Sequence, residues 1–357
     1  MNKEVKEEAG MGVDSYPIIG ILVPNKIRRK RALELHHRHC NLPLKLYAFT
    51  PTDILWRKRK IVGLCLIGHK LEERIFPFPH AVYNQCYNKK ATVIEHINSI
   101  IGKDKCFNSI NWFNKWDVYN LLTHSNVITY LPETFMLHDV DVLEFLKYYK
   151  LAYIKPCYGF QGNGVYRIEL KENGDIHISL DSIAPRFICR KNEDIEHLLV
   201  KVLGDRKFIV QRGVRSSLLK HKYYDIRVLV QKDGRGEWMV SSMVCRVANE
   251  LLFNTTAYGS IWNVEEVYAQ LYANKIVKEI AIRSIRRISV SAAEALEPYM
   301  GLLGELSVDF LLDQNKRAWI IELNGKPQKS IYKDVENFQC EELMYRRPLE
   351  YAYYLSQ

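Results

Sequence analysis

Residues 304–324 read GELSVDFLLDQNKRAWIIELN, and this stretch decides the fold. Two apolar runs flank Asn315-Lys316, a pair that suits a two-residue hairpin loop because Asn tolerates positive φ. The stretch therefore predicts a β-hairpin. With that loop length, Asp309 on the first strand lies directly opposite Glu322 on the second.

Oxygen-bearing side chains share one face of this hairpin. Because side chains alternate along a strand, Asn324 shares a face with Glu322, and Glu305 shares a face with Asp309. Like charges placed opposite each other destabilise a sheet unless something neutralises them, and oxygen ligands without His or Cys favour Mg²⁺ or Mn²⁺ over zinc. The hairpin thus predicts a metal site made by Asp309, Glu322 and Asn324. A solvent-facing polar face in a shifted register is the alternative, since a three-residue loop undoes the pairing.

Length and composition describe a folded protein of several modules. The chain has 357 residues, whereas single domains cluster around roughly 100 to 200 residues. It has no apolar run of about 18 residues and begins with a charged segment, so we expect no transmembrane segment and a cytoplasmic location. The eight cysteines stand singly, without a C-x-x-C pair or zinc spacing, and we expect reduced thiols.

The net charge of +10 favours an anionic partner but does not choose among nucleic acid, membrane, acidic polymer and nucleotide phosphates. The excess lies in short runs at 26–31, 57–60 and 283–287. None of these runs carries a zinc-finger, RRM or helix-turn-helix signature, so the sequence does not favour nucleic acid as the partner. Each run is either a solvated basic face or an anion-binding surface.

The order of apolar runs divides the chain into four parts. We expect a mobile tail at 1–15, an N-terminal α/β domain at 16–110, a linker helix with a central α+β lobe at 111–205, and a C-terminal α+β lobe at 206–357. The expected strands include 17–23, 44–49, 61–67, 151–155, 165–170, 208–211, 225–231 and 237–246, and the expected helices include 112–124, 192–203, 264–297 and a C-terminal segment.

Two lysines stand where they could hold phosphates. Lys115 lies early in the expected linker helix, and Lys155 ends an apolar strand just before a glycine-rich loop with Gly159, Gly162 and Gly164. Glycines let the backbone approach a phosphate and turn its N–H groups toward it. The loop is neither a Walker A loop nor a Rossmann fingerprint, because a strand follows it. A glycine-rich hairpin turn without a ligand is the alternative.

A third group of candidates follows the strand at 208–214, whose end could offer backbone groups to an adenine edge. Asp225 and Arg227 then share one face of the next strand, and Arg246 and Asn254 come later. An arginine beside an acid on a strand either clamps a phosphate or forms a structural ion pair.

These elements occur in an order that resembles the ATP-grasp superfamily, which includes glutathione synthetase and D-alanine:D-alanine ligase. More closely, the chain resembles the YheC/YheD endospore coat-associated group, in the phrases Phe113-Asn114-Lys115-Trp116, Leu131-Pro132-Glu133-Thr134, Tyr153-Ile154-Lys155-Pro156 and Glu322-Leu323-Asn324-Gly325-Lys326-Pro327. The resemblance covers nearly everything from residue 17 onward. It implies an ATP-grasp fold, in which an N-terminal α/β domain precedes two α+β lobes that enclose the nucleotide.

The resemblance also implies a role for each candidate residue. Lys115 and Lys155 would contact the phosphates of ATP, and the loop with Gly159, Gly162 and Gly164 would close over them. The remaining roles are the adenine frame (Gln211, Arg212, Val214), the catalytic group at the transferring phosphate (Arg227, Arg246, Asn254) and the Mg²⁺ ligands (Asp309, Glu322, Asn324). Gln211 stands where many relatives carry a glutamate.

The reaction implied is ATP-dependent activation of a carboxylate as an acyl phosphate, followed by attack of an amine or another nucleophile. Positioning and cationic neutralisation would supply the catalysis, without a protein nucleophile. The group also implies spore association, with spore-coat proteins as partners. The alternatives are a spore-associated ATP-binding protein without turnover and a kinase on the same fold.

Overall fold

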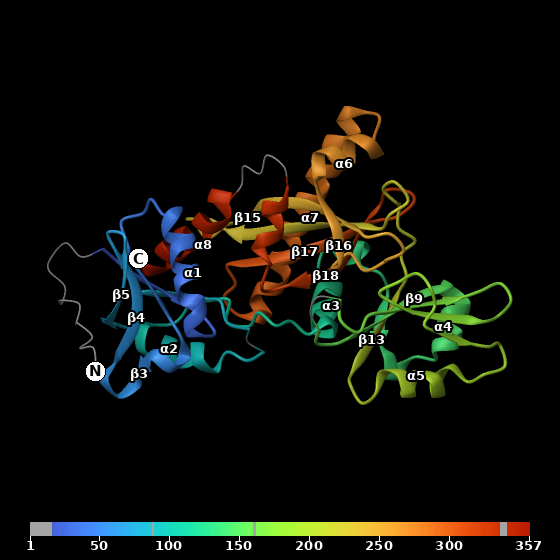
Figure 1. Ribbon diagram of the computed structural model, residues 1–357, viewed down its shortest axis with the longest axis horizontal. Coiled ribbons are helices and arrows are strands. Elements are labelled where there is room, and N and C mark those ends of the chain that lie inside the picture. The colour runs from blue at the N-terminus through green and yellow to red at the C-terminus, as the bar shows by residue number, and fades with distance from the viewer. Residues whose placement is uncertain (1–15, 88, 160–161, 336–340) are drawn as a thin grey trace.

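The computed structural model describes residues 16–87, 89–159, 162–335 and 341–357, so the tail expected at 1–15 lies outside the described residues. Three β-sheets follow one another along the long axis of the molecule (Figure 1). The first sheet lies at the end that holds both termini, the third lies in the middle, and the second lies at the far end.

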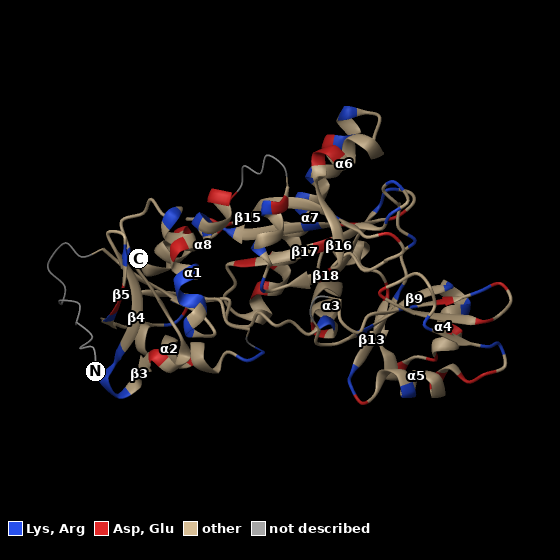
Figure 2. Cartoon of the chain, viewed as in Figure 1, with Lys and Arg blue, Asp and Glu red and all other residues tan. Residues whose placement is uncertain are grey.

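The first sheet is mixed, with strand order β3-β4-β2-β1-β6-β7 and β5 paired to β4. Its elements are β1 (Ile18–Leu22), α1 (Lys26–Arg38), β2 (Lys45–Phe49), β3 (Ile54–Leu55), β4 (Lys60–Ile67), β5 (Lys70–Pro77), β6 (Ala81–Asn84), α2 (Thr92–Ile101) and β7 (Cys106–Phe107). Every residue of β1 is buried, which explains its continuous apolar run. The basic run at 26–31 begins α1 (Figure 2).

The second sheet is antiparallel, in the order β12-β11-β10-β9-β13-β8. The elements of this region are α3 (Lys115–Thr123), β8 (Thr134–Met136), α4 (Val142–Tyr149), β9 (Leu151–Pro156), β10 (Tyr166–Leu170), β11 (Ile176–Leu180), β12 (Phe187–Cys189), α5 (Ile195–Leu203) and β13 (Phe208–Arg212). Apolar residues of α4 and α5 pack on the sheet to form one core.

The third sheet, in the order β16-β15-β14-β17-β18, has one apolar and one polar face. Its strands are β14 (Tyr224–Lys232), β15 (Trp238–Ala248), β16 (Tyr258–Asn263), β17 (Glu305–Leu312) and β18 (Ala318–Asn324), and the helices of this part are α6 (Val264–Leu271), α7 (Lys275–Met300) and α8 (Glu341–Ser356). Ile226, Val228 and Phe310 belong to the core that α7 covers. The alternate positions Asp225, Arg227, Asp309 and Glu322 therefore lie on the opposite face.

The last helix returns to the first sheet. Leu349, Tyr351 and Ala352 of α8 share a core with β1 and β6, and α8 lies beside α1 (Figure 1). Among the described residues, no helix is both long and apolar enough to cross a bilayer. The seven described cysteines are free thiols, as expected, and Cys340 lies outside the described residues.

The single helix expected at 264–297 is wrong, because two helices, α6 and α7, occupy this region. The first helix ends at Leu271. The Asn274 side chain then caps the second helix by accepting hydrogen bonds from Ile276 N (2.8 Å) and Val277 N (3.2 Å). Asn is among the preferred N-cap residues because its side-chain oxygen satisfies free N–H groups of the first turn. Buried apolar residues recur at helical spacing on both sides of the interruption, in α6 at Val264, Val267 and Tyr268 and in α7 from Ile282 onward, so the sequence pattern did not separate the two helices.

The hairpin of β17 and β18 pairs Asp309 with Glu322, as predicted, although its loop is longer than predicted. Leu312 pairs with Ala318, the turn is closed by a hydrogen bond from Lys316 N to Asp313 O (2.8 Å), and Lys316 itself has φ 63°. A bulge at Ile321 adds one residue to β18 and restores the register. The longer loop and the bulge cancel, so the two carboxylates still face each other.

Candidate functional site

A cleft of about 940 Å³, open to solvent, lies between β9 and β13 of the second sheet and the polar face of the third. Most of the predicted site residues line it: Lys115, Lys155, Gly159, Gly162, Gln211, Arg212, Val214, Arg246, Asn254, Asp309 and Glu322. Gly164, Arg227 and Asn324 are outside this lining. The structure therefore brings together candidates that span about 200 residues of sequence.

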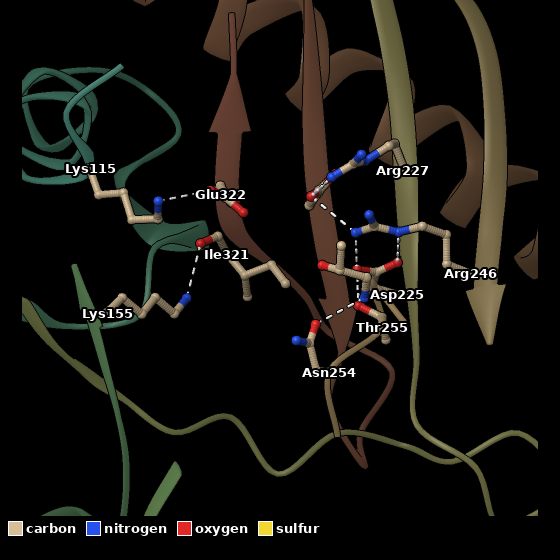
Figure 3. Close-up of polar contacts among 11 residues, drawn as sticks. Lys115, Lys155, Asp225, Arg227, Arg246, Asn254, Thr255, Ile321 and Glu322 are labelled. Atoms are coloured by element: carbon tan, nitrogen blue, oxygen red, sulfur yellow. Dashed lines mark hydrogen bonds and ion pairs between the residues drawn. The ribbon is translucent and has the colours of Figure 1, made fainter. Parts of the chain in front are cut away.

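Lys155, near the end of β9, points across the cleft toward β18 (Figure 3). Its Nζ donates to Gln211 Oε1 (2.7 Å) and to the carbonyl of Ile321 (3.3 Å), the residue that forms the bulge. Gln211 Nε2 in turn donates to Thr134 Oγ1 (3.0 Å). Burial lowers the pKa of Lys155 to about 8. A buried ammonium group with only neutral hydrogen-bond partners is well placed to bind an anion.

Lys115 occupies the first turn of α3, beside the glycine loop. Asn114 caps this helix by accepting from Trp116 N (3.0 Å), and Lys115 N donates to Cys157 O (2.8 Å). The Lys115 Nζ lies 3.0 Å from Glu322 Oε1 (Figure 3). Lys115 thus connects the start of α3 to two other parts of the site. Its backbone contacts the residue after β9, and its side chain contacts the metal-site candidate Glu322.

A buried network on the polar face of the third sheet joins Asp309 to Arg227, Arg246 and Asp225, and Figure 3 labels the last three. Arg227 donates to Asp309 through Nε (2.7 Å) and Nη2 (2.5 Å), and Arg246 Nη2 donates to the same carboxylate (3.1 Å). Arg246 Nε also donates to Asp225 Oδ1 (2.8 Å). Burial opposes ionisation of Asp309, but Arg227 and Arg246 hold its pKa below the usual value. Both carboxylates are therefore paired across strands, as charged groups buried in a protein must be.

The side chains of the predicted metal site are oxygen donors of the kind that Mg²⁺ binds. A carboxylate offers about four lone-pair positions, so the three hydrogen bonds to Asp309 leave one position for a cation. Asn324 pairs with Ser307 in the ladder, and its Nδ2 has no hydrogen-bond partner among the described residues. No group of three or more His, Cys, Asp or Glu suited to a metal occurs in the described part of the chain. A hard cation held by two carboxylates and one amide fits this donor set.

The glycine loop packs against the segment that follows β15. Gly162 and Gly164 have φ of +70° and +74°, and an ideal Cβ on Gly162 would lie 2.4 Å from Asn254 Nδ2. Asn254 itself donates to Asp181 Oδ1 (2.8 Å) on the second sheet's side of the cleft. Asn254 therefore contacts the glycine loop at Gly162 and links the two walls of the cleft through its hydrogen bond to Asp181. Phe160 and Gln161 lie outside the described residues.

Several cleft residues were not predicted from the sequence. Tyr153 and Phe253 form one apolar end, with their ring centroids 5.8 Å apart. Thr255 Oγ1 donates to Asp225 Oδ2 (2.6 Å) and so orients the partner of Arg246. Tyr153 lies two residues before Lys155 on β9, so their side chains share one face of the strand. Strand alternation could therefore have predicted Tyr153 as a cleft residue. Nothing in the local sequence marks Phe253 or Thr255, because their position depends on contacts between two lobes.

Comparisons with known proteins agree with this architecture. The family model described as YheC/D like ATP-grasp matches residues 103–355. The chain is 26% identical over 322 residues to the endospore coat-associated protein YheD of Bacillus subtilis strain 168, which covers 87% of this chain and 70% of that protein.

Two solved structures also match the chain over most of its length. The VanG D-Ala:D-Ser ligase from Enterococcus faecalis has a TM-score of 0.56 at 11% identity and is similar over 96% of this chain and 100% of its own. The ATP-grasp ligase PsnB, complexed with a phosphomimetic variant of its minimal precursor, Mg and ADP, has a TM-score of 0.53 at 14% identity over 95% of this chain and 99% of its own. These likenesses confirm the expected ATP-grasp fold. The chain belongs to the YheC/D-like ATP-grasp family.

Proposed function

We propose that the protein is a Mg²⁺- and ATP-dependent ligase that activates a carboxylate as an acyl phosphate and transfers the acyl group to an amine or a related nucleophile. One observation carries the proposal: a single cleft is lined by Lys115, Lys155, Arg246, Asp309 and Glu322. ATP-grasp proteins generally bind ATP with Mg²⁺, and Mn²⁺ has the same preference for oxygen ligands.

The nucleotide would lie between the apolar end of the cleft and its cationic end. Tyr153, Val165, Val214 and Leu311 provide apolar surface for the adenine, beside Gln211 and the backbone of Arg212 at the end of β13. The Arg212 side chain forms an ion pair with Glu133 (2.6 Å), so its backbone rather than its guanidinium is available to the base. Lys115 and Lys155 would then hold the phosphates, beneath the glycine loop.

When Mg·ATP binds, charged residues of the cleft would exchange their present ion-pair partners for the metal and the phosphates. Glu322 is paired with Lys115, and Asp309 with two arginines, so each anion has a cation before any ligand arrives. Asp309, Glu322 and Asn324 would hold Mg²⁺, which would supply positive charge against the negative charge of the phosphates. Lys115 then turns from Glu322 to a phosphate, and no charge remains unpaired.

In the proposed reaction a substrate carboxylate oxygen bonds to the γ-phosphorus of ATP as the β,γ-bridge breaks and ADP leaves. The nucleophile's nitrogen next bonds to the acyl carbon, phosphate leaves with the bonding pair, and the nitrogen loses a proton. Arg246 faces the cleft and would stabilise the charge on the transferring phosphoryl group, with Asn254 supporting the loop above it. Arg227 acts as a positioning residue through its two hydrogen bonds to Asp309.

The proposal extends to cellular context through YheD, whose name records association with the endospore coat. We propose that this chain associates with the spore, with spore-coat proteins as candidate partners. Fractionation of sporulating cells that express a tagged chain tests this: recovery with the spore supports it, and recovery only with the soluble fraction of the mother cell contradicts it.

Positional isotope exchange tests the proposed chemistry before the nucleophile is known. ATP labelled with ¹⁸O in the β,γ-bridge is incubated with the protein, Mg²⁺ and a panel of carboxylic acids. Reversible phosphoryl transfer to an acid scrambles the label in an acid-dependent manner, as the proposal requires. ATP that binds without scrambling or ADP release with any acid and amine indicates an ATP-binding protein without turnover, and a stable phosphorylated alcohol product indicates a kinase.

The affinity for nucleotide is expected to fall as pH rises above about 8, where Lys155 loses its proton. Phosphate oxygens favour the ammonium form, so the pKa of Lys155 is higher in the complex than in the free protein. Affinity is then constant below the free pKa and falls by up to about tenfold per pH unit above it. Titration of the nonhydrolysable analogue AMP-PNP from pH 7 to 10 measures this slope. Lys155→Arg stays charged over this pH range, so the affinity of this variant should depend less on pH. An equally steep fall in the variant would contradict the assignment of the pH dependence to Lys155.

Gly162→Ala is expected to weaken nucleotide binding by about tenfold, because an added Cβ would strain a left-handed backbone and displace the Asn254 amide that donates to Asp181. Gly68→Ala is the matched control, since Gly68 has φ +58° but no atom within 4 Å of an added Cβ. Titration of both variants with Mg·AMP-PNP shows whether the loss of affinity is specific to this loop or follows from strain at any glycine turn. Equal affinities in the two variants would argue against a role for the loop in nucleotide binding.

A further inference from the structure

A second pocket adjoins the nucleotide cleft on the side of the first sheet, and its space of about 340 Å³ includes open solvent. The two share Lys115, Gly159 and Glu322, and the rest of the second cavity includes Tyr87, Trp112 and Lys326. We call this cavity the acid pocket. It is assembled from the segment after β6, the linker before α3 and the turn after β18, so it exists only when the three parts of the chain are folded together.

The position of Lys326 is fixed by its neighbours. An ideal Cβ on Gly325 would lie 2.5 Å from Phe113 Cζ and 2.8 Å from the Cα of Asn111, so the backbone before Lys326 is pressed against the linker. The Lys326 Nζ then lies 4.3 Å from the centre of the Tyr87 ring. Tyr87 and Trp112 meet edge to face, with centroids 5.9 Å apart. Lys326 is therefore a fixed cation beside an aromatic wall.

Lys326 lacks the acidic partner that neighbouring cations have. Lys329, three residues later, lies 2.7 Å from Glu305 Oε2, whereas Lys326 has no carboxylate within 4 Å in the described part of the chain. A partly buried cation without a carboxylate partner gains a favourable interaction when an anion binds beside it.

Arg28 supplies the second cation and explains part of the basic run at 26–31. Its neighbour Arg29 is buried and paired with Asp53 (3.4 Å) and Glu73 (2.5 Å), so it is structural. Arg28 forms no ion pair within the described residues, and its charge, with that of Arg227, counteracts the burial that raises the pKa of Tyr87. Both guanidinium groups thus act on the acid pocket electrostatically.

One buried donor in the acid pocket is also unsatisfied. Asn324 Nδ2 is buried and has no hydrogen-bond partner among the described residues, although Asn324 lines the pocket. Leaving a buried donor without a partner costs about 1 to 3 kcal/mol in a folded protein, so a ligand acceptor here is favourable.

We propose that the acid pocket binds the acid substrate, and that this substrate is a dicarboxylate. The carboxylate to be phosphorylated lies at the shared wall near Lys115 and Glu322, facing the nucleotide. The second carboxylate lies at Lys326, with Arg28 adding charge, and the carbon chain between them covers Tyr87 and Trp112. This inference rests on the proposed function, because it places the acid next to the transferring phosphate.

The test measures acid binding to the full chain saturated with Mg·AMP-PNP, by calorimetry and by Trp112 fluorescence with Trp112→Phe as the reference. The probes are α,ω-dicarboxylates of four to eight carbons and the monocarboxylates of the same length, such as glutarate and valerate. At least one dicarboxylate is expected to bind about tenfold or more tightly than its monocarboxylate partner. Lys326→Met should remove this preference, whereas Lys103→Met, at an exposed position outside the pocket, should retain it.

Nucleotide affinity reports whether each variant is folded and separates the two proposals. If Mg·AMP-PNP binds but no dicarboxylate is preferred, or Lys326→Met keeps the preference, the dicarboxylate inference is overturned and the proposed ligase remains. If the wild-type chain does not bind Mg·AMP-PNP, the proposed function itself fails, and the inference fails with it.

Discussion

Asp309→Asn should lower the free energy of unfolding by about 3 to 5 kcal/mol, the cost of leaving a buried charge without its partner. Asp309 is 1% exposed and accepts hydrogen bonds from both Arg227 and Arg246. The substitution keeps the shape of the side chain but removes its charge, so both guanidinium groups lose a carboxylate. Urea denaturation of the two proteins, followed by circular dichroism, measures the difference.

Two further variants identify the cause of this destabilisation. Glu144→Gln removes an acid from an exposed ion pair with Lys147 on α4 and should leave the denaturation midpoint unchanged. Adding Arg227→Met to Asp309→Asn should recover part of the lost stability, because one uncompensated charge is removed. A single Asp309→Asn variant as stable as the wild type would contradict the buried-pair account of this site.

Glu322→Gln is expected to weaken Mg²⁺-dependent nucleotide binding by on the order of 100-fold, since the proposed metal site loses one of its ligands. The same change should leave nucleotide binding in EDTA unchanged or stronger, because Lys115 is freed from its 3.0 Å ion pair with Glu322. Unfolding would weaken binding under both conditions, so it cannot produce this pair of results. Titration of AMP-PNP with Mg²⁺ and with EDTA measures them.

The control for Glu322→Gln is Glu342→Gln, which removes the acid of an ion pair with Arg346 on α8 (2.5 Å), away from the cleft. It should bind the nucleotide as the wild type does under both conditions. If Glu322→Gln retains the full advantage that Mg²⁺ gives the wild type, Glu322 is not a metal ligand.

The sequence predicted that Asp309 lies opposite Glu322, and strand alternation is a local property, but the two-residue loop on which this pairing was based is wrong. It could not predict that the loop is one residue longer and that a bulge at Ile321 compensates, since no residue there demands a bulge. The bulge reaches the proposed site, because the carbonyl of Ile321 accepts a hydrogen bond from Lys155. The sequence pattern and the structure thus give the same pairing of Asp309 with Glu322, but in the structure it depends on a longer loop and a bulge.

The ion pairs of the site also could not be predicted from local sequence pattern. The sequence places Asp225 and Arg227 on one face of a strand, which suggests that they interact. In the structure each pairs across strands instead, Arg227 with Asp309 and Asp225 with Arg246. These choices depend on the register of β14 against β15 and β17, which joins residues far apart in sequence. The identity of the charged residues was predictable, but their partners were not.

Calorimetric titration of the wild-type chain with Mg·AMP-PNP tests the central claim most directly, namely that this cleft binds metal-bound nucleotide. We predict one saturable site per chain whose affinity falls when EDTA replaces Mg²⁺ and when Lys155 is replaced by Met. Absence of binding at millimolar nucleotide, or binding that neither EDTA nor Lys155→Met weakens, would contradict it.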